Sequence, residues 1–141
     1  MEGNPLSFII PKAIVEAIVD HARREAPNEC CGILAGRDGR VFKHFLAKNA
    51  DASRYRYHFD PREYLQIWQE IEANGWELQA IYHSHTFTGA YPSATDIDEA
   101  NPILPEALYI IVSLADPEEP VVRAFRIREG RVLPEELRVS E

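Results

Sequence analysis

The apolar residues at the start of the chain predict a strand followed by a helix. Residues 6–10 form a short apolar run typical of a strand. Residues 11–24 carry apolar side chains at helical spacing, and they begin with Pro11, which suits the first turn of a helix. Pro27 would end this helix.

A β-hairpin is predicted next. Residues 31–35 form a continuous apolar run, and a turn at 37–39 leads into a second strand over Arg40–Ala47. Residues 49–53 are polar and are expected to form a loop. Tyr55, Tyr57 and Phe59 then alternate with polar residues, which predicts a half-buried strand over 55–59.

A second helix is predicted to begin at Asp60-Pro61 and to end at Asn74-Gly75. Its apolar side chains fall on one face of a helix. They are Tyr64, Ile67, Trp68 and Ile71. Residues 78–82 are then expected to form a strand that ends at a pair of histidines.

The last part of the chain predicts a short helix at 93–100, followed by strands at 107–114 and 121–127 that are expected to form a hairpin. A turn at 128–130 precedes a strand-like tail. Helices between strands, with hairpins at the end, predict an α/β layered fold built on a mixed sheet.

The composition is typical of a globular protein with one domain over residues 1–141. Apolar residues make up 45% and charged residues 27% of the chain. The net charge of −8 argues against binding to nucleic acid, which requires clustered lysine and arginine. The apolar run at the N-terminus is too short for a signal peptide or a membrane span, so we expect a cytoplasmic protein that does not bind membranes.

His83 and His85 suggest a metal site. Residues two apart on a strand point to the same face, so both imidazoles would lie together. Seven residues separate His85 from Ser93, and two more separate Ser93 from Asp96. Two imidazoles and one carboxylate are a ligand set that zinc accepts in catalytic sites, where a fourth position is left for water.

Structural alternatives exist for each of these residues. Histidines at the end of a strand are often packed rather than metal-binding. Ser93 and Asp96 also match a helix capping box, although a capping serine can still have a second role. Cys30 and Cys31 are adjacent, so they would point to opposite faces and could not form a disulfide. Cys31 is better interpreted as a small buried hydrophobic residue than as a zinc ligand.

The spacing His83-x-His85, seven residues, Ser93, two residues, Asp96 resembles the JAMM motif of the MPN-plus metalloproteases. The family also has a glutamate far upstream. Here Glu29 lies in the segment PNECCGILAG, which resembles the family's junction between a helix and a strand. The resemblance extends from about residue 6 to residue 127.

This resemblance implies an MPN/JAB1 fold, similar to that of cytidine deaminases, with a single mixed, mostly antiparallel sheet flanked by helices. It implies that His83, His85 and Asp96 bind one catalytic Zn²⁺. It further implies that Glu29 acts as general base and then general acid, and that Ser93 stabilises the oxyanion. Without the resemblance, Glu29 would be interpreted as a solvated acid after a helix.

The resemblance also suggests a substrate. Thr86-Phe87 stand where many prokaryotic members have Pro-Asp, which would alter the wall of the cleft, and the loops are short. Short loops favour the compact prokaryotic branch, whose members hydrolyse the bond after the Gly-Gly tail of a ubiquitin-like sulfur carrier, in one case releasing cysteine. Such a tail is expected to add to a strand edge. A catalytically silent scaffold and a hydrolase of another peptide remain alternatives, and the sequence leaves the oligomeric state open.

Overall fold

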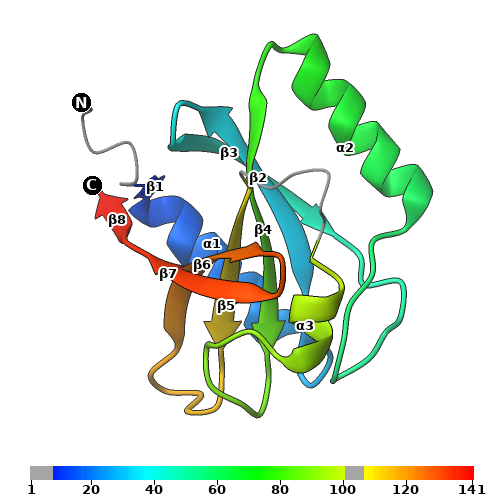
Figure 1. Ribbon diagram of the computed structural model, residues 1–141, viewed down its shortest axis with the longest axis vertical. Coiled ribbons are helices and arrows are strands. Elements are labelled where there is room, and N and C mark those ends of the chain that lie inside the picture. Colours follow the sequence, from blue (N-terminus) through cyan, green and yellow to red (C-terminus); the bar gives the residue numbers. More distant parts are fainter. Residues whose placement is uncertain (1–7, 101–106) are drawn as a thin grey trace.

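The computed structural model describes residues 8–100 and 107–141, which form a sheet and three helices (Figure 1). The strands are β1 (Phe8–Pro11), β2 (Cys31–Arg37), β3 (Arg40–Ala47), β4 (Glu77–His85), β5 (Leu108–Ser113), β6 (Val121–Arg128), β7 (Arg131–Glu135) and β8 (Leu137–Ser140). The helices are α1 (Lys12–Glu25), α2 (Pro61–Ala73) and α3 (Ala94–Asp98).

The described strands form one mixed sheet in the order β7-β6-β5-β4-β2-β3-β1-β8. The pairs β2/β3, β2/β4, β5/β6 and β6/β7 are antiparallel, while β4/β5, β1/β3 and β1/β8 are parallel. This confirms the expected mixed, mostly antiparallel sheet with helices beside it. Strands β7 and β8 lie at opposite edges although only Glu136 separates them, so the sheet must curl to bring its two edges together.

Helix α1 covers one face of the sheet and α2 covers the other. Ile18 and Ala22 of α1 are buried against Leu34, Tyr82 and further residues of the central strands. The ring of Tyr82 lies over Gly32 of β2, where an added Cβ would lie only 2.2 Å from the ring. Glycine therefore makes room for this tyrosine.

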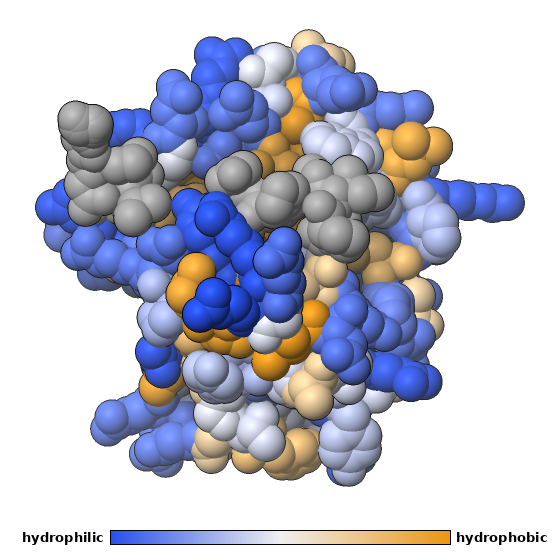
Figure 2. Space-filling view, viewed as in Figure 1, coloured by the Kyte–Doolittle hydropathy of each residue, from blue (hydrophilic) through white to orange (hydrophobic). Residues whose placement is uncertain are grey.

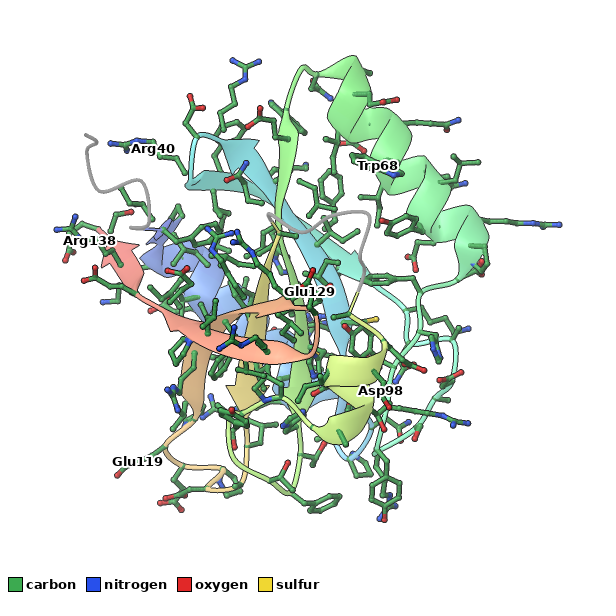
Figure 3. All side chains as sticks on the ribbon, in the orientation of Figure 1. Arg40, Trp68, Asp98, Glu119, Glu129 and Arg138 are labelled. Carbon is green, nitrogen blue, oxygen red and sulfur yellow. The ribbon has the colours of Figure 1, made fainter. Side chains whose placement is uncertain are left out.

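On the opposite face, the apolar stripe predicted for the second helix packs against β2 and β3. Ile67 and Ile71 are buried with Cys31, and Trp68 lies on the side of α2 that faces the sheet (Figure 3). The Asp60 side chain caps this helix by accepting a hydrogen bond from the Arg62 N–H at 2.9 Å, as expected from the sequence.

The strand predicted for residues 55–59 is wrong. Tyr57 and Phe59 do pack against the core, which explains the alternation, but only an isolated bridge between Asn49 and Phe59 joins this segment to another. Alternation alone predicts which side chains are buried, whereas a strand also needs a neighbouring strand along its length. The strand that was expected to end at residue 82 continues through His85, and residues 6 and 7 of the first predicted strand lie outside the described residues.

The surface seen in Figure 2 is mainly hydrophilic, with scattered hydrophobic side chains. Among the helices of the described residues, none combines the length and the apolar character that crossing a membrane requires. Cys30 and Cys31 are both buried and free, on opposite faces of the sheet. This agrees with the prediction that they form no disulfide.

Candidate metal centre

The register between β2 and β4 brings Glu29 and the histidines together. Cys31 lies opposite His83 in the antiparallel ladder. Beyond this pair, Ser84 Oγ accepts a hydrogen bond from the Cys30 N–H at 2.8 Å. One further step along both chains places Glu29 across from His85, on the face of the sheet that α2 covers.

Two imidazoles and one carboxylate converge on this face. The Nε2 atoms of His83 and His85 lie 3.2 Å apart, and they lie 3.0 and 2.9 Å from Asp96 Oδ2. The side chains of His83, His85 and Asp96 are 1%, 4% and 7% exposed. Among the described residues, these three form the one group of potential metal ligands whose donor atoms lie within 4.8 Å of one another.

The donor set fits a zinc ion. Zinc binds histidine nitrogen and carboxylate oxygen at about 2.0–2.2 Å, so its tetrahedral ligands lie about 3.3–3.6 Å apart. The three separations of 2.9–3.2 Å are close to this range. Burial by itself would raise the pKa of Asp96, but hydrogen bonds from both histidines outweigh it and hold the pKa well below its usual range. The carboxylate is therefore ionised, as a metal ligand must be.

The two rings are held in place differently. His85 Nδ1 donates a hydrogen bond to the carbonyl of Gly89 at 2.9 Å, which directs its Nε2 toward His83 and Asp96. The ring of His83 stacks on Tyr57, with centroids 4.5 Å apart and planes inclined by 23°. Its Nδ1 is buried and has no partner among the described residues. Packing thus orients one histidine and a backbone carbonyl orients the other.

Glu29 is buried beside this group. It is 4% exposed, and its Oε1 has no hydrogen-bond partner among the described residues. Burial raises the pKa of Glu29 to about 8, with His85 lowering it and Asp96 raising it by smaller amounts. A carboxyl group with such a pKa can hold and release a proton near neutral pH. The interpretation of Glu29 as a solvated acid is therefore wrong.

Ser93 forms the helix cap that its sequence predicted. Its Oγ accepts a hydrogen bond from the Asp96 N–H at 3.0 Å, and its own N–H donates to Asp96 Oδ2 at 2.9 Å. The capping box thus fixes the carboxylate that points at the histidines. Because Oγ acts as an acceptor in the cap, its O–H remains available to donate.

A cavity of about 500 Å³ lies next to Asp96. Its wall is largely aromatic and apolar, formed by Tyr57, Phe59, Pro61, Tyr64, Ile81 and Tyr109. The remaining lining residues are polar or charged: Arg56, His58, Thr95 and Glu99 together with Asp96. An apolar cavity with a few polar groups beside a metal centre is a common arrangement in substrate-binding sites.

Several supporting residues were not identified from the sequence. Asn49 is buried, and its Nδ2 donates to the carbonyls of Glu29 and Arg56, each at 3.0 Å. The Glu29 N–H donates to the carbonyl of Ser53 at 2.8 Å. The sequence pattern predicts a loop at Asn49 and a half-buried strand at Tyr57, and it assigns neither residue a role in the site. Their roles depend on long-range contacts that no local spacing indicates.

Comparison with known proteins shows which family the chain resembles. Residues 11–128 match the family described as prokaryotic homologues of the JAB domain. The chain is 40% identical to a CysO-cysteine peptidase of Mycobacterium tuberculosis, over 99% of this chain and 96% of that protein. It is 35% identical to a probable TtuB-protein conjugate cleaving protease of Thermus thermophilus, over 89% of this chain and 80% of that protein.

Solved structures share the fold. A solution structure of a Desulfitobacterium hafniense protein superposes with a TM-score of 0.86 at 38% identity, over 95% of this chain and 93% of that one. A JAB1/MPN domain protein of Archaeoglobus fulgidus superposes with a TM-score of 0.59 at 17% identity, over 95% and 97% of the two chains. The second similarity bears on the fold alone, and it agrees with the expected MPN/JAB1 fold.

Proposed function

The chain belongs to the family of prokaryotic homologues of the JAB domain, and from this premise we propose that it is a zinc-dependent peptidase. Its substrate is a ubiquitin-like sulfur carrier, and it hydrolyses the bond that follows the C-terminal Gly-Gly of this carrier. The observation that best supports this proposal is the convergence of His83, His85 and Asp96 beside the buried carboxyl of Glu29. A structural zinc site would normally be closed by a fourth protein ligand, and the described residues offer three.

His83, His85 and Asp96 would hold the zinc ion. When bound, zinc acts as a Lewis acid and makes water a usable nucleophile at neutral pH. Glu29 Oε1 takes a proton from the attacking water and later gives it to the leaving amine, a role for which its burial and raised pKa are suited. The Ser93 O–H donates to the oxygen on which negative charge develops.

The substrate class rests on the relatives. One of them is a peptidase named for CysO-cysteine, and another is named for cleaving TtuB-protein conjugates. From these names we infer a substrate in which the C-terminal acyl group of a carrier protein is joined to an amine. The names leave open whether this amine belongs to a single amino acid or to a second protein.

That the tail adds to a strand edge stays a prediction, but β4 does not provide that edge at the metal centre. Strand β4 pairs with β5 as far as His85 and with β2 as far as His83, and beyond this pair the Ser84 N–H donates to the Cys30 carbonyl, so β4 offers no free edge beside His83. We therefore place the tail in the cavity next to Asp96, along residues 56–59. Tyr57 in that segment already contacts His83.

The test is cleavage of a purified sulfur carrier that bears a residue after Gly-Gly, followed by mass spectrometry. Wild-type protein loaded with zinc should cleave it. Glu29→Gln should bind zinc with the same stoichiometry but lose about 10²–10⁴-fold in turnover. Arg62→Gln, an exposed change at the start of α2, should cleave like wild type. Full cleavage by Glu29→Gln, or by protein stripped of metal, would exclude this mechanism.

A further inference from the structure

The metal centre has two different flanks. The cavity lies on the flank of Asp96 and Tyr57. On the other flank, two loops are tied to the segment that carries Glu29: Ser53 accepts the Glu29 N–H at 2.8 Å, and Thr86 Oγ1 donates to the carbonyl of Pro27 at 2.9 Å. The residues that follow these two contacts in the chain therefore lie next to the segment 27–29, which carries Glu29.

Those residues are Arg54 and Phe87, and they contact each other. The Arg54 guanidinium lies 5.7 Å from the centre of the Phe87 ring, so the two loops meet through a cation–π contact. Both side chains are exposed, and Phe87 is 57% exposed. Stacking on an aromatic ring fixes the plane of a guanidinium while leaving its N–H groups free to bind an anion.

Arg54 also lacks an acidic partner. The neighbouring Arg56 pairs with Asp51 at 3.4 Å, whereas among the described residues no carboxylate forms an ion pair with Arg54. In a chain of net charge −8, an exposed arginine that stacks on a phenylalanine and has no acid beside it is available for an external anion.

We propose that Arg54, held by Phe87, binds the free α-carboxylate of a leaving group that is a single amino acid. This inference rests on the proposed function and specifies its leaving group. Hydrolysis breaks the C–N bond after Gly-Gly, the carbonyl carbon gains the oxygen of water, and the amine receives its proton from Glu29. The amine therefore departs on the Glu29 flank, and in a single amino acid the carboxylate lies only one carbon away from it. A lysine side chain of a protein would bring no carboxylate to this place.

The test compares three substrates made on one sulfur carrier: Gly-Gly followed by one amino acid with a free carboxylate, the same amino acid as its carboxamide, and Gly-Gly joined to a lysine side chain. Wild type should prefer the free acid over the amide by at least about tenfold in kcat/KM, as expected for a charge-assisted hydrogen bond. Arg54→Gln should abolish this preference by slowing only the acid, and Arg54→Lys should restore part of it. The control variant Arg62→Gln, which changes an exposed arginine on α2, should retain the preference for the free acid.

Binding provides a readout that does not depend on turnover. The inactive Glu29→Gln protein should bind the free acid more tightly than the amide in calorimetry, and the double variant with Arg54→Gln should bind both equally. If wild type cleaves the acid and the amide equally well, the assignment of Arg54 is wrong while the proposed function stands. If none of the three substrates is cleaved, the proposed function fails and this inference fails with it.

Discussion

The imidazole of His85 is oriented by the backbone of Gly89, four residues further along the chain, through a hydrogen bond of 2.9 Å. A carbonyl can only accept, so His85 Nδ1 carries the hydrogen and Nε2 faces the other ligands. The loop after β4 thus fixes the orientation of the His85 ring, so that its Nε2 already faces the other ligands without a bound metal ion.

We expect His83→Ala and Asp96→Ala each to lose stoichiometric zinc, because two ligands cannot hold the ion as three do. Wild type should gain about 2.7 kcal/mol in its free energy of unfolding when free zinc exceeds its dissociation constant a hundredfold, and the variants should gain none. Metal analysis and urea unfolding with and without zinc would measure both effects.

His58→Ala is the control for this prediction, since His58 is an exposed histidine outside the ligand group. Equal zinc content in His83→Ala and His58→Ala would contradict the assigned ligands. Complete unfolding of wild type by a chelator would show that the fold itself requires the ion.

Substitutions at Ser93 should separate its two roles. Ser93→Ala removes both the cap and the hydroxyl donor, and should cost about 1 kcal/mol of stability together with about 10²–10³-fold in kcat. Glycine is tolerated at the N-cap position, so Ser93→Gly should lower the folding stability by only a few tenths of a kcal/mol, but this variant also lacks the hydroxyl donor. A similar loss of kcat in both variants, with different stabilities, is the expected result. If Ser93→Gly turns over like wild type, Ser93 is a cap only.

Asn49→Ala should lower activity through Glu29 and the segment at residues 56–58. The substitution leaves the carbonyls of Glu29 and Arg56 and the His58 N–H without their side-chain partner. Each buried group that loses its partner costs about 1–3 kcal/mol. Asn74→Ala, which removes a bond to the Glu70 carbonyl at the exposed end of α2, should change stability and turnover little. Equal effects of the two substitutions would exclude a positioning role for Asn49.

Acid should destabilise the fold by protonating buried histidines on the face of the sheet that α1 covers. The Tyr82 hydroxyl lies 2.7 Å from both His21 Nδ1 and His44 Nε2, and burial lowers the pKa of His44 to about 4. Between pH 6.5 and 4 the unfolded chain therefore binds a proton that the folded chain does not, and the folded state loses up to about 3 kcal/mol. Burial also lowers the pKa of His21, which adds to the loss.

Urea unfolding at pH 7 and pH 4.5 would measure this loss, and His44→Gln should reduce it. His58 offers an opposite control, because its Nδ1–H donates a hydrogen bond to the Asp51 carboxylate and this raises the pKa of His58. The stability that His58 contributes is present below pH 6.5 and is lost as the pH rises through its folded value, so His58→Gln should lower stability on the acidic side. A pH dependence unchanged by His44→Gln would show that other groups cause the loss.

Much of the site could be predicted because it depends on local rules. The two-residue period of a strand puts His83 and His85 on one face, and the Ser-x-x-Asp spacing of a capping box fixes Asp96 at the start of a short helix. The same period separates Cys30 from Cys31. The alternation at residues 55–59 was misleading because it indicates burial and says nothing about whether another strand lies alongside.

By itself, the sequence determined the donor types, their spacing and the faces on which they lie, since these follow from backbone geometry over a few residues. Only the tertiary structure decided what surrounds them. The register of β2 against β4 brings Glu29 to His85, Tyr57 stacks on His83, and Asn49 joins the Glu29 segment to a distant loop. The physical reason is that such contacts depend on how the whole sheet pairs and curls, and a chain of alternating apolar and polar residues is compatible with several pairings.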